Sequence, residues 1–248
     1  MMNLNLYDEY LNGRYLEVWD DISSLAYDNL QEEERAIVIK IIKEALSRID
    51  HNVAVVQKIL RDNGFDYINF GDINPFDQPH LLRDPEDYDG LIQELTKTDP
   101  DQKIPLFFAS FSSFFKVIDF RGLFKQFEVE ILLDALFIES PSNLKDVEDR
   151  KFELVYQGEP VFGCLVSPDA YVKENTSGDL GPCILLNKET LVDNFIINYS
   201  EDMPMTFVEY LRFCFHWACF PNLFWVSEEE REPFQPILKQ VRENLKQF

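Results

Sequence analysis

EEERAIVIKIIKEALSRIDHNVAVVQKILRDNG, residues 32–64, is the most strongly patterned stretch of this chain. Its apolar residues recur in steps of three and four, the spacing that gathers side chains on one face of a helix. They are Val38, Ile42, Ala45, Ile49, Val53, Val56 and Leu60. Gly64 suits the left-handed position just past a helix. We therefore expect one continuous helix over residues 32–63, with this apolar row buried.

The start of this helix carries a capping pattern. Asn29 is a favourable N-cap residue, and Glu32 follows three positions later. Glu32, Glu33 and Glu34 place negative charge where the helix dipole favours it. We expect Asn29 to cap the helix. A shorter helix is expected to precede it, from Tyr15 to about Asn29.

The chain falls into three stretches by composition. Residues 1–65 predict a helical N-terminal unit. Residues 66–89 are rich in Asp and Asn and contain Gly71, Pro75, Pro79 and Pro85, which break helix and strand alike. This stretch predicts a long connection. Residues 90–248 mix helical and strand patterns, so we expect an α+β fold with a small mixed or antiparallel sheet packed by helices.

Several elements are expected within residues 90–248. A short helix is predicted over Leu91–Thr96, and an aromatic helix around Phe107–Phe115 that is buried in the core. Short apolar runs near turn residues predict strands. These runs are Val117–Phe120, Leu136–Ile138, Pro160–Val166 and Cys183–Leu186, and the charged segment Asn143–Arg150 is interpreted as helix or loop.

The last part of the chain is predicted to be helical. Thr206 and Glu209 form a capping-box pattern before an apolar run that Pro221 is expected to end. Glu209, Arg212 and His216 follow one another at spacings of three and four, which predicts one polar edge on a mostly buried helix. A final amphipathic helix is expected from Ser227, interrupted near Pro233 and Pro236.

The charge balance limits the classes of partner. The 248 residues include 45 Asp and Glu against 23 Lys and Arg, a formal net charge of −22. Nucleic-acid binding is not expected, because a phosphate backbone needs clustered cations. Such acidity suits a basic protein partner, or it serves solubility alone. No apolar run approaches the roughly 18 residues of a membrane span. The first residues lack a basic, apolar leader pattern, so a cytoplasmic location is expected.

Motifs of catalysis and cofactor binding are not found in the sequence. There is no phosphate-binding glycine loop, nucleophile elbow or HExxH pattern. The four cysteines form no C-x-x-C pair and lie in apolar stretches, which indicates buried, reduced thiols rather than metal ligands. We expect no cofactor and no metal. The sequence leans away from an enzyme without excluding one.

Two sets of residues are candidate sites. The acidic cluster Asp84, Glu86, Asp87, Tyr88 and Asp89 is a candidate partner-binding surface, with the tyrosine supplying buried area. It does not have the ligand spacing of a calcium loop. The second set is Glu209, Arg212 and His216, which either form the wet edge of a buried helix or line an aromatic pocket for a small ligand. Asp119–Arg121 and Glu209–Arg212 are interpreted as surface ion pairs.

Two stretches resemble a known superfamily. The first runs from Ile104-Pro105-Leu106-Phe107 to Asp119-Phe120-Arg121-Gly122, and the second from Thr206-Phe207-Val208-Glu209-Tyr210-Leu211-Arg212 through Trp217 to Phe220-Pro221. Over about residues 90–225 the chain resembles the SUKH superfamily, which includes cell-wall regulators and bacterial immunity proteins. The resemblance implies an α+β binding module without shared catalytic residues. It implies a partner such as a toxin, which this chain would mask.

Overall fold

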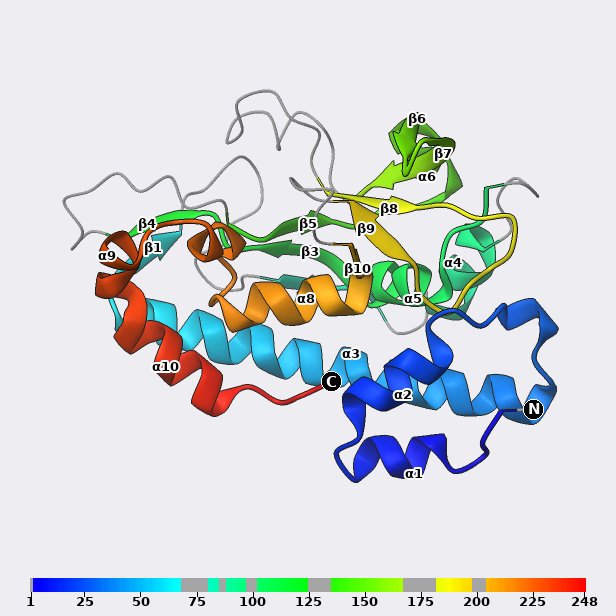
Figure 1. Ribbon diagram of the computed structural model, residues 1–248, viewed down its shortest axis with the longest axis horizontal. Coiled ribbons are helices and arrows are strands. Elements are labelled where there is room, and N and C mark those ends of the chain that lie inside the picture. The colour runs from blue at the N-terminus through cyan, green and yellow to red at the C-terminus, as the bar shows by residue number, and fades with distance from the viewer. Residues whose placement is uncertain are drawn as a thin grey trace.

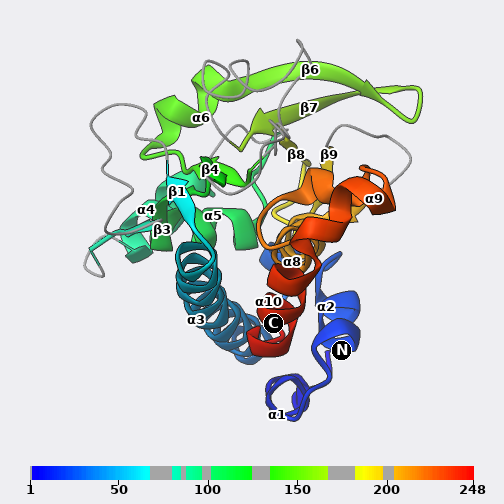
Figure 2. The ribbon, with the colours of Figure 1, turned by 90° about the vertical axis from the view of Figure 1, so that its left-hand side faces the viewer.

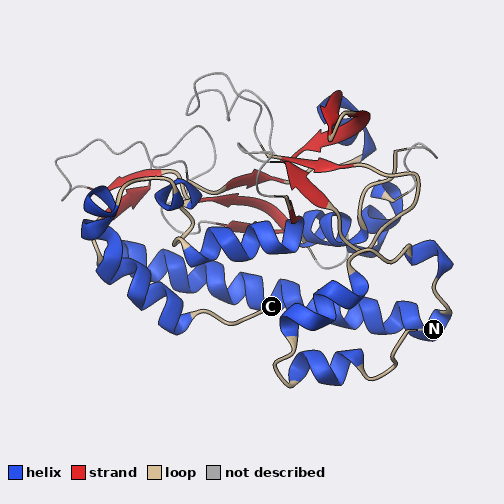
Figure 3. Cartoon of the chain, viewed as in Figure 1, coloured by secondary structure: helices blue, strands red, loops and turns tan. Residues whose placement is uncertain are grey.

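The computed structural model describes residues 2–67, 80–84, 88–96, 102–124, 135–166, 182–197 and 204–248. It is an α+β structure, as predicted, in which the strands lie over a layer of helices (Figures 1 and 3). The helices are α1 (Leu6–Leu11), α2 (Tyr15–Ile22), α3 (Glu32–Asp62), α4 (Tyr88–Leu95), α5 (Leu106–Phe114), α6 (Leu144–Arg150), α8 (Phe207–His216), α9 (Glu228–Arg231) and α10 (Gln235–Asn244).

The strands of the described residues form three antiparallel groups. The largest has the order β10-β9-β8-β7-β6, with β10 (Met205–Thr206), β9 (Phe195–Ile197), β8 (Cys183–Leu185), β7 (Glu159–Leu165) and β6 (Lys151–Tyr156). The second has the order β2-β3-β5, with β2 (His80–Leu82), β3 (Phe115–Asp119) and β5 (Phe137–Glu139), and the third pairs β1 (Phe65–Tyr67) with β4 (Gly122–Phe124). The sheet is therefore antiparallel, one of the two arrangements expected.

Helix α3 is the continuous helix that its apolar row predicts. It spans 31 residues, and the whole predicted row from Val38 to Leu60 is buried. Figure 2 views α3 nearly along its axis, with α10 beside it. Helix α10 packs on both α3 and α8, so the last helix joins the long helix to the one below the strands.

The predicted cap of α3 is wrong. Residues Tyr27–Asn29 form a 3-10 turn, and the N-cap is Gln31, whose backbone N–H donates to the Glu34 carboxylate at 2.9 Å. The capping residues thus keep their spacing but are shifted by two positions. The helix expected over Tyr15–Asn29 ends at Ile22, because Ala26 leaves helical geometry to bridge Leu191.

A bent segment without regular secondary structure, residues 187–194 and called the extended segment below, ties the elements together. Lys103 and Asn187 form an isolated bridge, and so do Ala26 and Leu191. The carbonyl oxygens of Leu191 and Val192 accept hydrogen bonds from the Leu106 and Phe107 N–H groups, each at 2.8 Å. These are the first amides of α5, which have no partner within their own helix. The predicted aromatic helix is therefore anchored at its N-terminus by this segment, and it is buried in the core as expected.

Phenylalanine rings join α5 to α8. Phe207, the first residue of α8, lies 5.2 Å from Phe108 and 5.2 Å from Phe111 between ring centroids, at steep interplanar angles. Edge-to-face aromatic pairs of this kind add about 0.5–1.5 kcal/mol each to area burial. Three hydroxyls of α5, those of Ser110, Ser112 and Ser113, are buried beside these rings.

Helix α8 is ended by left-handed residues, not by Pro221. The helix stops at His216, and the buried residues Ala218 and Cys219 have φ angles of +53° and +66°. This reversal lets the Cys219 carbonyl oxygen accept from the Leu136 N–H at 2.7 Å, next to β5. Pro221 instead begins the 3-10 turn Pro221–Phe224.

The Asp119–Arg121 ion pair is buried rather than on the surface. The Arg121 Nε and Nη2 atoms donate to the two carboxylate oxygens of Asp119 at 2.9 and 2.8 Å, and the side chains of both residues are 5% exposed. The guanidinium also lies 4.0 Å from the centre of the Phe137 ring. The pair therefore joins the end of β3 to β5. Because both charges are removed from water there, their attraction offsets the desolvation cost only if the hydrogen-bond geometry is good.

The left-handed pair after α8 gives a stability prediction. Glycine adopts positive φ without steric cost, so Ala218→Gly relieves about 1–2 kcal/mol of strain. The lost methyl and the more flexible unfolded chain cost about as much. We expect a change in the free energy of unfolding below about 0.5 kcal/mol. The control is Ala109→Gly, at a buried helical position. It should cost about 1.5–2 kcal/mol. Equal losses in urea titrations of the two variants would contradict the strain argument.

Candidate functional site

The polar edge of α8 is largely occupied by structural contacts. Glu209 accepts the Thr206 N–H at 2.6 Å and thereby completes the predicted capping box. Arg212 donates through Nε to the Phe248 carbonyl oxygen and through Nη2 to that of Tyr15 at 3.3 Å. The predicted Glu209–Arg212 ion pair is therefore replaced by contacts that connect α8 to Tyr15, at the start of α2, and to Phe248, after α10.

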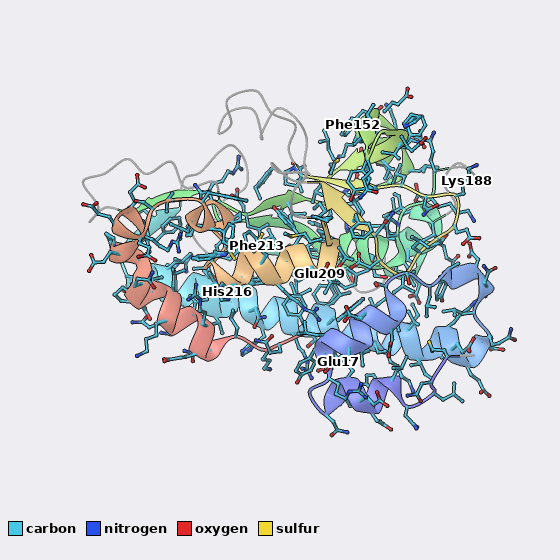
Figure 4. The ribbon with its side chains drawn as sticks, viewed as in Figure 1. Glu17, Phe152, Lys188, Glu209, Phe213 and His216 are labelled. Atoms are coloured by element: carbon cyan, nitrogen blue, oxygen red, sulfur yellow. The ribbon has the colours of Figure 1, made fainter. Side chains whose placement is uncertain are left out.

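Arg212 and His216 line one pocket, and Glu209 is not among its lining residues. The pocket has a volume of about 300 Å³, and α10 contributes Arg242 to it. Figure 4 shows Glu209 and His216 well apart along α8. Another part of the pocket wall is the segment Leu245–Phe248, which Asn52 holds by two hydrogen bonds to the Lys246 backbone, each 2.8 Å. The structure thus brings two of the three predicted residues to a small pocket.

His216 lies at the mouth of this pocket. It is exposed, and Arg242 Nε donates to its carbonyl oxygen at 3.1 Å. Partial burial of the imidazole, reinforced by the Arg242 charge, holds the pKa of His216 below its ordinary value. A proton on this ring is therefore disfavoured in the folded state.

The acidic cluster is described only in part. Asp84 follows β2 and is exposed, Tyr88 begins α4, and Asp89 is exposed in the first turn of α4. Glu86 and Asp87 lie outside the described residues. The described members of the candidate partner-binding surface are thus brought to the N-terminal end of α4.

A larger groove lies between α3, α4 and α5. It has a volume of about 890 Å³, and Ile42, Leu46 and Leu106 form part of its apolar wall. Asp89 stands on its rim, and so does the Lys103–Asp28 ion pair, with a 3.0 Å separation. The Ser110 hydroxyl is buried in this wall and makes no hydrogen bond within the described residues. Sequence reasoning missed the groove, because its walls come from three helices far apart in the chain.

The most unusual titratable group is Asp193, at the end of the extended segment. Its carboxylate accepts the Val208 N–H of α8 at 3.0 Å and the Asn194 N–H at 2.8 Å. The residue is 1% exposed. Burial raises the pKa of Asp193 to about 7, although its N–H donors act in the opposite direction. No sequence motif marks this residue, because its partners lie on a different element.

The four cysteines are free and buried. Burial raises the pKa of the Cys164 thiol to about 12, and it raises those of Cys214 and Cys219 as well. Such thiols are poor nucleophiles and poor metal ligands. Among the described residues, no group of three or more His, Cys, Asp or Glu side chains has the arrangement of a metal site. No helix of the described part combines the length and apolar character needed to cross a membrane.

Comparison with known proteins adds no relative. No protein-family model, no curated protein and no solved structure matches the chain.

The lowered pKa of His216 predicts a pH-dependent stability difference. The unfolded chain takes up a proton near the ordinary histidine value of about 6.5, and the folded state resists it. Wild type should therefore lose stability relative to His216→Gln as pH falls through 6.5 toward the lowered folded-state value. We expect the melting temperature of the variant to increase relative to that of wild type as pH is lowered from 8 to 5.5. A gap that is the same at both pH values would contradict this.

Asp193 predicts the opposite pH trend. Its ordinary pKa is about 4, and the folded state raises it. The stability that this group contributes is therefore present at low pH and is lost as pH rises from about 4 to about 7. In urea unfolding, the free energy of unfolding of Asp193→Asn should increase relative to that of wild type as pH rises from 5.5 to 8. The lost hydrogen-bond acceptor adds a cost that does not change with pH and so does not affect this trend. A gain of wild type over the variant in that range would be the wrong sign.

Proposed function

We propose that this chain is a cytoplasmic, immunity-like protein-binding module that masks a basic partner. The proposal is supported most by how its arginines are used. Many of them donate to backbone carbonyl oxygens rather than pairing with surface carboxylates. They are Arg35, Arg150, Arg212, Arg231 and Arg242, while Arg48 binds both a carbonyl and Glu44. The acidic surface is thus left less neutralised than the composition alone suggests.

One group of exposed carboxylates lies where α4, α6 and β6 meet. The Leu144 N–H at the start of α6 donates to Glu94 of α4 at 3.0 Å, so the two helices are tied together. Exposed acids of this region are Asp84, Asp89, Glu148, Asp149 and Glu153, here called the acidic face. A face of one sign raises the association rate of a partner of opposite sign and disfavours others.

Lys145 of α6 is exposed at the acidic face, whereas two other cations near it, Lys151 and Arg150, are engaged. Lys151 pairs with Glu148 at 2.8 Å, and its side chain is only 10% exposed. Arg150 donates to the Glu139 carbonyl oxygen. The face therefore presents net negative charge, which suits a partner rich in Lys and Arg. A toxin nuclease, which needs cations to bind phosphates, is one such partner, and the SUKH resemblance is consistent with it.

A second candidate function is the binding of a small ligand. We place it in the groove between α3, α4 and α5 rather than at the pocket of Arg212 and His216. The groove is of the size usual for ligand sites, and Ser110 offers a buried hydroxyl there. An apolar ligand with one hydrogen-bonding group fits this chemistry.

Charge reversal tests the first function. A triple variant of the acidic face, Asp89→Lys with Glu148→Lys and Asp149→Lys, is compared with Glu228→Lys, Glu229→Lys and Glu232→Lys, exposed residues around α9. Both variants change the net charge by the same amount. Affinity capture from the source cells should return a stoichiometric basic protein with wild type and with the α9 variant. The acidic-face variant should bind that protein about 10–100-fold more weakly at low salt.

The other outcomes decide against the proposal. Equal weakening by both triple variants would mean that net charge alone acts. Capture of no basic protein would refute the function. In that case, a small molecule found by native mass spectrometry on the purified protein would favour the groove.

A further inference from the structure

The hairpin of β6 and β7 extends beyond the rest of its sheet. Strand β8 pairs with Gly163–Leu165 of β7, and the Leu186 N–H just after β8 donates to the Phe162 carbonyl oxygen at 2.9 Å. Phe162 thus lies at the base of an arm, residues 153–162, and the rest of this arm has no third strand beside it among the described residues. Figure 2 shows β6 and β7 running sideways past the other strands.

The arm exposes apolar side chains that a solvated hairpin does not need. Val155 is 65% exposed and Phe162 is 39% exposed. The register pairs Glu153 with Phe162 and Val155 with Pro160, so these residues share one face. A two-stranded hairpin in water is only marginally stable. The turn residues Gln157 and Gly158, with φ angles of +50° and +83°, supply the twist that such a hairpin needs. The exposed apolar groups indicate that the arm packs against something else.

The two edges of the arm differ in what their backbones offer. A two-residue loop makes Tyr156 and Glu159 the hydrogen-bonded pair, so the alternate residues of β6 point their N–H and C=O groups away from β7. These outward residues are Lys151, Glu153 and Val155. No backbone hydrogen bond within the described part of the chain uses the outward groups of Glu153 and Val155, whereas the Lys151 N–H donates to the Glu148 carbonyl oxygen at the end of α6. On the opposite edge the corresponding residue is Pro160, which has no N–H to donate.

Proline is a common protection of strand edges. Only one edge of the arm carries it. The β7 edge is blocked at Pro160, whereas β6 keeps the outward donors and acceptors of Glu153 and Val155. Strand addition is therefore possible on β6 and hindered on β7.

Charge indicates which strand would be added. Residues 153–162 contain Glu153 and Glu159 and no Lys or Arg, and Lys151, at the start of the edge, is paired with Glu148 at 2.8 Å. Glu148 and Asp149 of the acidic face lie just before β6, on α6. A second copy of this chain would bring the same carboxylates and a net charge of −22 against its own kind. An extended segment carrying Lys or Arg meets the opposite charge.

We propose that the outer edge of β6 is a docking site for an extended, basic segment of a partner protein, which adds as a sixth strand beside Lys151–Tyr156. The proposal rests on the proposed function and names its contact. Main-chain hydrogen bonds to Glu153, to Val155 and to the Lys151 carbonyl oxygen give affinity. Alternate side chains of the segment lie beside Glu153 and Val155 on one face and beside Phe152 and Leu154 on the other. The segment therefore alternates basic and apolar residues.

Two β6 variants separate the backbone from the charge. Glu153→Pro removes an outward N–H and the carboxylate, but breaks no hydrogen bond to β7. Glu153→Ala removes the carboxylate alone. The probe is a ten-residue peptide of alternating valine and lysine, followed by fluorescence anisotropy. We expect Glu153→Ala to weaken its binding less than about tenfold and Glu153→Pro to weaken it more than about a hundredfold. Equal binding by wild type and Glu153→Pro overturns the docking site.

Further probes exclude simple charge attraction and misfolding. The same peptide methylated at its amide nitrogens keeps its charge and side chains but loses its donors, and it should not bind wild type. Its binding as tightly as the parent peptide overturns strand addition even if Glu153→Pro fails to fold. A valine–glutamate peptide should also fail to bind. Self-association of wild type in sedimentation, abolished by Glu153→Pro, would instead assign the edge to a second copy.

The function and the docking site fail differently. If the captured basic protein binds wild type and Glu153→Pro equally, the edge is not its contact, but the proposed function stands. If no basic protein is captured while the peptide binds, the edge is functional as a site and the proposed function fails.

Discussion

Unpaired amides at helix N-termini are the constraint on which this fold depends. Helices α5 and α8 both begin in the interior, where their first N–H groups cannot reach water. The extended segment 187–194 satisfies them, with two carbonyl oxygens for α5 and the Asp193 carboxylate for α8. The same segment accepts the Tyr27 N–H and bridges Ala26, so it also holds the start of the N-terminal region. This one segment of irregular structure thus fixes the starts of α5 and α8, whose side chains form much of the core.

This constraint explains what the sequence could and could not predict. The row on α3 was predictable because helical periodicity is local, and so was the Thr206–Glu209 capping box. The prediction of Asn29 as the cap was wrong because Leu30 and Gln31 are extended in the structure. The bridge between Ala26 and Leu191 fixes this conformation. Residues 187–194 show no periodicity, so their role is visible only in three dimensions. Strand β6 was missed because its apolar and charged residues alternate without burial of either face.

For the candidate sites, too, local sequence patterns were predictable and three-dimensional contacts were not. Glu209 was correctly placed in a capping box, and that role occupies its carboxylate. The predicted division at residues 65 and 89, the SUKH resemblance and the toxin partner stay predictions. What the structure adds is the use of several arginines, which donate to backbone carbonyl oxygens, and the position of one group of exposed carboxylates on α4, α6 and β6.

The four buried thiols can serve as intrinsic probes of local opening in this protein. Burial keeps all four from alkylating reagents as long as the chain stays closed, and the raised pKa values of Cys164, Cys214 and Cys219 add to this protection. Labelling therefore proceeds only through openings of the structure, and its rate measures how often each opening occurs. Cys164 lies in the sheet at β7, whereas Cys219 lies in the left-handed turn after α8. Mass spectrometry of labelled peptides can thus compare the lifetimes of these two regions without introducing any foreign probe.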